Sequence, residues 1–305
     1  VRAAPERMQQ VRAVDEQTLD VGQAAPRCRH TRHHAPMLLL VDLDGVVYRG
    51  TAPVRGVAEL LAARAGIGDD VVYVTNNSMF YRTAYVTRLE GMGAPVSADR
   101  VVSSGRATAL YLREHEPDVR RVLVVGASGL EREMRDVGLE VITAAHAATR
   151  MSHEGVDGWE AAGRPDAVIA GLDPQLTYSR LAVAADAIRA GARFIATNRD
   201  PTYPTERGFQ PGAGTVVAAL EVASGVVPLA IGKPGPLLLE EAAKAVGRDA
   251  RDAVMIGDAM SDIAAAHAVG CRSILMLTGV TTRDRLDAVA AADHPTAVAE
   301  DAAEL

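Results

Sequence analysis

The chain has 305 residues, of which 48% are hydrophobic and 23% charged, a composition typical of a folded globular protein. This length is sufficient for two domains of the usual size, about 100–200 residues each. The formal net charge of −7 provides no excess of basic residues for a phosphate backbone, so nucleic-acid binding is disfavoured. No apolar run approaches the ~20 residues of a membrane-spanning helix, so no membrane partner is expected.

The N-terminal segment Val1–His34 is rich in Arg, Gln, Ala and His and is predicted to be a poorly ordered extension. Its histidines, in RCRHTRHHAP, are loosely spaced among polar residues, which favours a solvated tail over a metal site. The two cysteines, Cys28 and Cys271, are far apart and lack metal-ligand spacing. Their scarcity suits a reducing compartment, so a cytoplasmic protein is predicted.

From residue 36 onward, short β-branched runs alternate with longer segments of helical period, which predicts an α/β fold with parallel sheets. Continuous apolar runs such as LLLV and AVMI indicate strands that are buried on both faces. In chain order, strands are predicted at Met37–Asp42, Val71–Thr75, Val122–Val125, Ala167–Ala170, Phe194–Thr197, Leu229–Ile231, Ala253–Ile256 and Ser273–Leu277. Helices are predicted at Val57–Arg64, Ala84–Met92, Ala107–His115, Tyr178–Ala190, Thr215–Ala223, Leu237–Ala245 and Asp262–Val269.

Polar motifs follow four of these strands at the point where each strand ends. They are DLDG at 42–45, TNNS at 75–78, GKPGP at 232–236 and GDAMSD at 257–262. Ligands of an open α/β sheet bind beyond the carboxyl ends of its strands. The four motifs together therefore predict one site at that edge.

Asp42 and Asp44 are two residues apart, so their side chains are predicted to point to the same face, and Gly45 permits a tight turn. Two carboxylates this close repel each other, and a cation relieves the repulsion. With Asp258 from another strand end they form a set of hard oxygen ligands suited to Mg²⁺. An Asx turn is the alternative interpretation of the Asp-x-Asp-Gly motif taken alone.

Lys233 follows an apolar strand, where a lysine can neutralise a carboxylate nucleophile and hold a transferring phosphoryl group. A lone lysine at such a position is otherwise an exposed loop residue. The Thr75 hydroxyl can bind a phosphoryl oxygen or cap the following helix. Asn76, Asn77 and Ser78 can cap that helix equally well, and the N-terminus of a helix also favours a bound anion. Thr75, Asn76 and Lys233 are therefore the predicted phosphate-binding residues.

These motifs resemble those of the haloacid dehalogenase-like hydrolases. More narrowly, they resemble the 4-nitrophenylphosphatase branch, which includes phosphoglycolate, glycerol-3-phosphate and pyridoxal-phosphate phosphatases and bacterial nucleotidases. The similarity runs from Leu38 to the end, through SSGRATALYL, VLVVGASGL, AVIAGLDPQLTY and ATNRDPTYPTERGFQPGAGTVVAALEVASG. It implies a Rossmann-like parallel-sheet core, residues 35–102 and 215–305, with an inserted α/β cap domain at residues 103–214.

The resemblance also implies a mechanism. Asp42 attacks phosphorus and forms an aspartyl-phosphate, while Asp44 protonates the leaving oxygen and later takes a proton from water. Mg²⁺ is held by Asp42, the backbone carbonyl of Asp44 and Asp258, while Thr75 and Lys233 position the phosphoryl group. An aspartate at the position of Asp44 goes with phosphate transfer rather than carbon–halogen cleavage.

In related enzymes a cap loop selects the substrate, and here that loop is NRDPTYPTERG at 198–208. Asn198, Asp200 and Tyr203 are the predicted specificity residues. Packing within a rigid proline-rich turn is the alternative role for Tyr203. The glycines of PGAG, at 211–214, predict the hinge by which the chain returns to the core.

The last motif departs from the pattern of close relatives, which have four residues between its two aspartates and Arg-Leu after the first. Here three residues separate Asp258 from Asp262, and Ala259 and Met260 follow the first aspartate. Asp262 is therefore predicted either to support the metal or to cap the next helix.

The predicted function is Mg²⁺-dependent hydrolysis of a small phosphomonoester of the glycerol 3-phosphate or 2-phosphoglycolate type. An enclosing cap disfavours phosphoproteins and nucleic acids as substrates. Sugar phosphates, pyridoxal phosphate and nucleoside monophosphates are alternatives, as is phosphoryl transfer to an acceptor other than water. A catalytically silent metabolite-binding protein is the alternative of another class. A homodimer formed through the cap is compatible with the resemblance.

Overall fold

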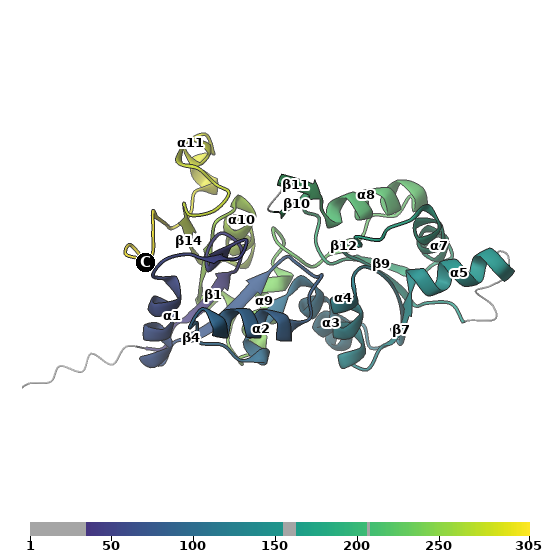
Figure 1. Ribbon diagram of the computed structural model, residues 1–305, viewed down its shortest axis with the longest axis horizontal. Helices are drawn as coiled ribbons and strands as arrows, with labels where there is room; N and C mark the ends of the chain where they lie inside the picture. The colour runs from purple at the N-terminus through teal and green to yellow at the C-terminus, as the bar shows by residue number, and fades with distance from the viewer. Residues whose placement is uncertain (1–34, 155–162, 206–207) are drawn as a thin grey trace, which may run out of the picture. The chain divides into compact units, whose positions relative to one another are not determined.

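The computed structural model describes residues 35–154, 163–205 and 208–305 (Figure 1). The predicted extension, Val1–His34, lies outside the described residues. Within the described ranges, helices that combine the length and apolarity needed to cross a bilayer are absent. The predicted α/β architecture is confirmed, since the chain forms two parallel sheets with helices on their faces.

The first sheet carries the predicted strand-end motifs. Its six parallel strands lie in the order β15 (Ala297–Ala299), β14 (Arg272–Met276), β13 (Ala253–Gly257), β1 (Leu38–Asp42), β4 (Asp70–Thr75) and β5 (Val101–Ser103). Every residue of β1 is buried, because β13 and β4 flank it on both sides. Asp42 therefore ends the central strand of this sheet.

Helices cover both faces of the first sheet (Figure 1). Leu38 and Leu40 pack on one face, whereas Leu39 and Val41 pack on the other, as the two-residue period of a strand requires. This double burial is why the LLLV run is continuously apolar. The helices are α3 (Ser104–His115), α9 (Leu237–Lys244) and α10 (Met260–Val269) on the first face, with α1 (Val57–Gly66) and α2 (Arg82–Gly91) on the second.

The second sheet has five parallel strands, in the order β12 (Leu229–Ala230), β9 (Arg193–Ala196), β8 (Ala167–Ala170), β6 (Arg121–Val125) and β7 (Glu140–Thr143). One face packs against α5 (Ala144–Glu154), α7 (Tyr178–Arg189) and α8 (Ala213–Ser224), and the other against α4 (Ser128–Asp136). The helix α3 contacts both α4 and α9, and so connects the packing of the two sheets.

The extent of the second sheet differs from the segment 103–214 that the sequence predicts for the cap. At its start, α3 packs against β5 and α9 of the first sheet. At its end, β12 pairs with β9, and the predicted hinge at 211–214 spans the end of β11 and the start of α8, which packs on the second sheet. The strand predicted at Leu229–Ile231 is present as β12, but the sequence did not indicate which sheet it joins. We propose that the inserted domain starts after α3 and ends at Ala230.

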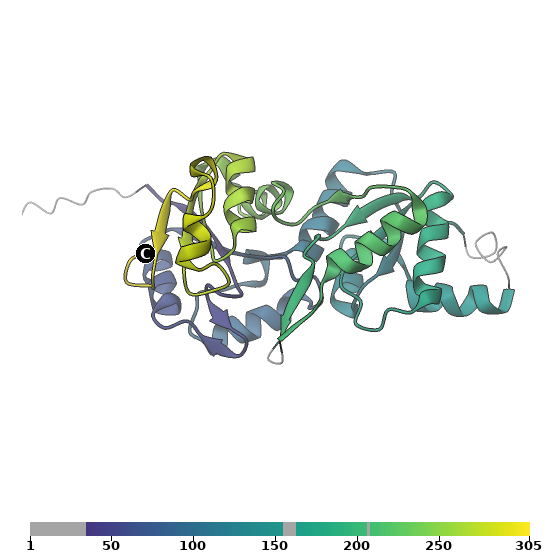
Figure 2. The ribbon, with the colours of Figure 1, turned by 90° about the horizontal axis from the view of Figure 1, so that it is seen from above.

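Two short antiparallel hairpins lie outside the two large sheets and were not predicted from the sequence. The first joins β2 (Tyr48–Arg49) to β3 (Ala52–Pro53), directly after the DLDG motif. The second joins β10 (Thr202–Thr205) to β11 (Gly208–Pro211) and contains most of the predicted specificity loop (Figure 2). Both hairpins contribute residues to the cavity described next.

Candidate active site

A cavity of about 770 Å³ opens at the carboxyl ends of β1, β4 and β13, where the four polar motifs meet. Every residue that the sequence analysis assigns to the site lines it: Asp42, Asp44, Thr75, Asn76, Asn198, Asp200, Tyr203, Lys233, Asp258 and Asp262. Its wall also includes side chains that the sequence analysis did not single out, among them Arg49, Phe209 and Arg285. Strand-end position therefore located the cavity correctly.

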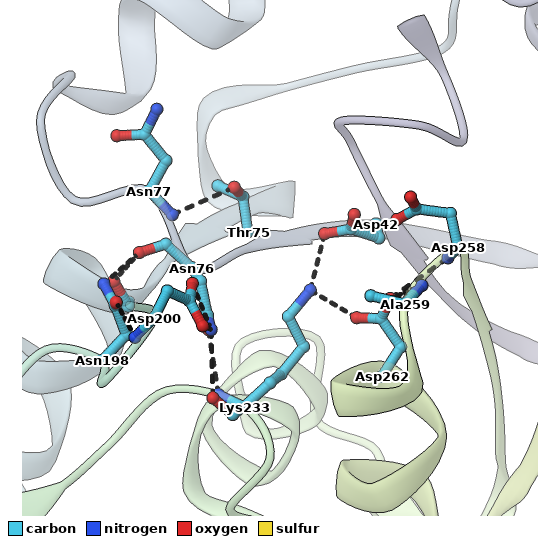
Figure 3. Close-up of polar contacts among 11 residues, drawn as sticks. Asp42, Thr75, Asn76, Asn77, Asn198, Asp200, Lys233, Asp258, Ala259 and Asp262 are labelled. Atoms are coloured by element: carbon cyan, nitrogen blue, oxygen red, sulfur yellow. Dashed lines mark hydrogen bonds and ion pairs between the residues drawn. The ribbon is translucent and has the colours of Figure 1, made fainter. Parts of the chain in front are cut away.

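Lys233 lies at the centre of the polar cluster (Figure 3). Its Nζ lies 2.6 Å from Asp42 Oδ1 and 2.6 Å from Asp262 Oδ1, and only 4% of the residue is exposed. Burial by itself lowers the pKa of Lys233, but the charges of Asp262 and Asp42 outweigh it and raise the pKa. The ammonium group therefore stays charged, and the interpretation of Lys233 as an exposed loop residue is wrong.

Three buried carboxylates surround this single lysine. Oxygen atoms of Asp42, Asp258 and Asp262 lie within 4.8 Å of one another. Burial raises the pKa of Asp42 well above its usual value, although Lys233 opposes the shift. Burial, together with the charge of Asp262, raises the pKa of Asp258 to about 7. One ammonium group for three carboxylates leaves an excess of negative charge, and these hard oxygen donors fit Mg²⁺.

A loop after β14 fixes Asp258 in place. The Val280 backbone N–H donates to Asp258 Oδ2 at 2.7 Å, and the Thr278 hydroxyl donates to the Gly45 carbonyl at 2.7 Å. A Cβ on Gly279 would lie 1.8 Å from Asp258 Oδ2, so only glycine fits there. The sequence analysis missed this loop, although a glycine just past a predicted strand was the available signal.

Asp262 takes one of the two roles between which the sequence did not decide, that of the helix cap. Its Oδ2 accepts hydrogen bonds from the backbone N–H groups of Asp258 and Ala259, at 3.1 and 3.0 Å, at the start of α10. Its Oδ1 forms the ion pair with Lys233. The carboxylate therefore caps the helix and faces the cluster, while its part in metal binding stays a prediction.

Burial and neighbouring positive charges have opposite effects on the pKa of Asp44. Burial raises the pKa of Asp44, while the positive charges of Arg88 and Lys233 lower it. The Arg88 guanidinium stacks on the Tyr48 ring, 3.5 Å from its centroid. Arg88 was not predicted as a site residue, because it lies within the helix α2 and in none of the strand-end motifs. Tyr203 lines the same cavity, where burial and the Asp44 charge raise its pKa.

Thr75 takes part in a turn rather than in a helix cap. Its Oγ1 accepts a hydrogen bond from the Asn77 backbone N–H at 3.2 Å, and Asn77 Oδ1 accepts one from the Met79 N–H at 2.9 Å. The next helix, α2, begins only at Arg82, with Tyr81 as its N-cap. The interpretation of the TNNS motif as a cap for the following helix is therefore wrong.

The side chain of Asn76 is engaged by the protein itself (Figure 3). Its Nδ2 donates to both Asp200 oxygens, at 3.2 and 3.0 Å, and to the Lys233 carbonyl at 3.0 Å. Its Oδ1 accepts a hydrogen bond from the Lys233 N–H at 2.9 Å. Asn198 Nδ2 donates to the Asn76 carbonyl at 2.7 Å. Two of the predicted specificity residues, Asn198 and Asp200, thus contact the first sheet's TNNS motif.

Comparisons with known proteins identify the family to which a chain with this fold and this cluster of aspartates around a buried lysine belongs. Residues 39–140 match the family model of haloacid dehalogenase-like hydrolases, and residues 230–305 match a second, HAD-hydrolase-like model. The chain is also 35% identical to the acid sugar phosphatase of Staphylococcus saprophyticus, over 81% of this chain and 89% of that protein. The chain therefore belongs to the haloacid dehalogenase-like hydrolases.

Solved structures give the same assignment and agree with the predicted branch. A glycerol phosphate phosphatase from Mycobacterium tuberculosis, in complex with magnesium, matches with a TM-score of 0.75 and 36% identity, over 88% of this chain and 76% of that one. The 4-nitrophenylphosphatase of Thermotoga maritima matches with a TM-score of 0.75 and 31% identity, over 88% and 95% of the two chains. The predicted family and fold are thus confirmed.

Proposed function

We propose that this protein is a magnesium-dependent phosphatase that hydrolyses small phosphomonoesters through an aspartyl-phosphate intermediate. The observation that carries the proposal is the buried contact of Lys233 with Asp42 at the end of the central strand, 2.6 Å from Nζ to Oδ1. A lysine in this position opposes protonation of the Asp42 carboxylate and offers positive charge to an incoming phosphoryl group. Relatives named as phosphatases support the same chemistry.

In the first step, a carboxylate oxygen of Asp42 bonds to phosphorus while the bond from phosphorus to the leaving oxygen breaks. Asp44 donates its proton to that leaving oxygen, and burial favours the protonated form that this task requires. In the second step, Asp44 takes a proton from water as the water oxygen attacks phosphorus. The bond between phosphorus and Asp42 then breaks, which restores both carboxyl groups.

The remaining site residues hold the phosphoryl group and the cation. Lys233 and the Thr75 hydroxyl position the phosphoryl oxygens, while the Asn76 side chain acts through Lys233. Asp42, Asp258 and the backbone carbonyl of Asp44 would hold Mg²⁺, with Asp262 beside them. When bound there, Mg²⁺ neutralises charge that develops on the phosphoryl oxygens.

Substrate choice is assigned to the β10–β11 hairpin. Tyr203 and Phe209 of this hairpin line the cavity, and Phe209 is largely exposed and so available for contact with a ligand. Glycerol 3-phosphate and 2-phosphoglycolate are the first candidates, and sugar phosphates follow, in line with the names of the relatives. A cavity of about 770 Å³ accommodates any of these.

The test is phosphate release from 4-nitrophenyl phosphate and from a panel of phosphorylated metabolites, with and without Mg²⁺. Turnover is expected only with the metal, and Asp42→Asn is expected to lower kcat by about 10³-fold or more, because the nucleophile is lost. Tight metabolite binding without any turnover would instead identify a catalytically silent protein. Transfer of phosphate to an added alcohol would identify a phosphotransferase.

We also propose a cytoplasmic homodimer that associates through the inserted domain. Val222, near the end of α8, and Val227, just after it, are exposed. The strand β12, which follows them, is an edge strand, and its Leu229 is partly exposed. Cys271 is a free thiol, as expected in a reducing compartment. Sedimentation velocity is expected to give a dimer that Val227→Asp converts to a monomer. A monomeric wild type would contradict this proposal.

A further inference from the structure

Three segments that are distant in the sequence meet at the side chain of Asn76 (Figure 3). Asn76 follows β4 of the first sheet, Asp200 follows β9 of the second, and Lys233 lies between β12 and α9. The contacts of Asn76 with Asp200 and Lys233 span 124 and 157 positions. One amide therefore joins the inserted domain, the first sheet and the loop that carries the site lysine.

The hydrogen-bonding capacity of this amide is fully used on the two sides. Its Nδ2 donates to the Asp200 carboxylate and to the Lys233 carbonyl, and its Oδ1 accepts from the Lys233 N–H. An amide has two donor hydrogens and an acceptor oxygen, so a single side chain can serve both partners. A carboxylate of the same shape has no donor and would face Asp200 with like charge.

The loop between β12 and α9, which carries Lys233, packs closely against this amide. A Cβ on Gly232 would lie 2.6 Å from Asn76 Oδ1 and 2.7 Å from the Thr197 carbonyl, so only glycine fits between them. The Gly232 N–H also donates to that Thr197 carbonyl at 2.8 Å. Gly232, the residue before Lys233, is therefore enclosed between Asn76, which follows a strand of the first sheet, and Thr197, which follows a strand of the second.

In the inserted domain, further hydrogen bonds hold Asp200 in its contact with Asn76. Asn198 Oδ1 accepts from the Asp200 N–H at 3.0 Å, while Asn198 Nδ2 donates to the Asn76 carbonyl at 2.7 Å. The Gly214 N–H at the start of α8 donates to the Asp200 carbonyl at 2.8 Å. This cap loop therefore bonds to both the side chain and the backbone of Asn76.

We infer that Asn76 is a positioning residue that couples the cap loop to Lys233, so that the lysine is held at Asp42 only while Asp200 binds Asn76. The inference rests on the proposed function and assigns Asp200 to site assembly rather than to direct substrate contact. It places the effect of the coupling on kcat, because Lys233 acts on the reacting carboxylate, 2.6 Å away.

The test exchanges the two partners. Asn76→Asp removes both donors and opposes two carboxylates, and is expected to lower kcat by about 10²-fold with KM changed less than about threefold. Asp200→Asn keeps an acceptor and is expected to lower kcat by about tenfold or less. The double variant Asn76→Asp/Asp200→Asn restores an amide–carboxylate pair in reverse order. It is expected to recover about tenfold over Asn76→Asp alone.

The matched control is Asp173→Asn, a buried carboxylate of the inserted domain that pairs with Arg180 instead of the first sheet. Its kcat is expected to equal that of the wild type. Thermal unfolding of each variant separates lost folding from lost positioning. If Asn76→Asp does not fold, Asp200→Ala tests the same coupling from the cap side, and an unchanged kcat there would overturn the inference.

A readout independent of turnover is hydrogen exchange at the Lys233 amide, which is bonded to Asn76 Oδ1. Faster exchange is expected in Asp200→Ala and in Asn76→Asp, with recovery in the double variant. Folded variants without recovery in either kcat or exchange would overturn the coupling. Absence of turnover in the wild type would instead contradict the proposed function, and the exchange data would still decide the inference.

Discussion

The two parallel sheets share an architecture but differ in what their carboxyl edges carry. The edge of the first sheet concentrates charge, with Lys233 held between Asp42 and Asp262. The edge of the second sheet instead contacts the TNNS motif of the first, because the Thr197 hydroxyl lies 3.1 Å from that of Ser78 and Asp200 Oδ2 accepts a hydrogen bond from Asn76 Nδ2 at 3.0 Å. The same fold thus provides a chemical site in one place and a docking edge in the other. Function follows from the side chains placed on the edge, not from the sheet.

The largest effect is expected from removing the charge that distinguishes the first edge. Lys233→Met leaves Asp42 and Asp262 without their buried partner, so kcat is expected to fall by about 10³-fold. The metal-free protein is expected to lose about 3–5 kcal/mol of its free energy of unfolding. Steady-state kinetics and urea unfolding measure both. A variant within tenfold of wild-type kcat would show that the charge is dispensable.

The next effect comes from the loop that supports the metal-binding edge. Gly279→Ala would place a methyl group against Asp258 Oδ2, so the aspartate must move. Mg²⁺ affinity and kcat are each expected to fall by about 10–100-fold. Gly66→Ala is the matched control, since nothing lies within 4 Å of a Cβ at that helical position. Equal Mg²⁺ affinity in the two variants, measured by titration calorimetry, would refute the role of the loop.

A pH effect follows from the clustering of carboxylates at the first edge. Because the pKa of Asp258 is raised to about 7 in the metal-free protein, its protonated form stabilises the fold below that pH, and this contribution is lost as pH rises through 7. Mg²⁺ must displace that proton, so its affinity is expected to rise about tenfold per pH unit up to pH 7. Magnesium titrations from pH 5 to 8 test this, and a flat profile would exclude it.

The smallest effect is expected at the β10–β11 hairpin of the inserted domain. Its described residues that line the cavity form no buried charge pair. Tyr203→Ala is expected to change kcat/KM by about tenfold or less, and unequally among substrates, because one contact surface in a pocket is lost. The ratio of kcat/KM for glycerol 3-phosphate to that for a sugar phosphate measures this selectivity. An unchanged ratio would place substrate selection elsewhere than at Tyr203.

The sequence predicted the charged cluster better than the contacts between the two sheets, for a physical reason. Asp42, Lys233 and Asp258 each follow an apolar strand directly, so local pattern and strand-end position together place them. The partners of Asn76 and the pairing of β12 with β9 depend on contacts between distant segments, which local periodicity does not encode. Likewise Gly279 acquires its importance only through its closeness to Asp258.

The central claim is that Asp42 becomes phosphorylated, and the most direct measurement is to trap that intermediate. Rapid quenching during turnover, followed by peptide mass spectrometry, is expected to find a hydroxylamine-sensitive phosphate on the peptide that contains Asp42. The same experiment on Asp42→Asn is expected to find none. Phosphate on a different residue, or turnover by Asp42→Asn at the wild-type rate, would contradict the mechanism.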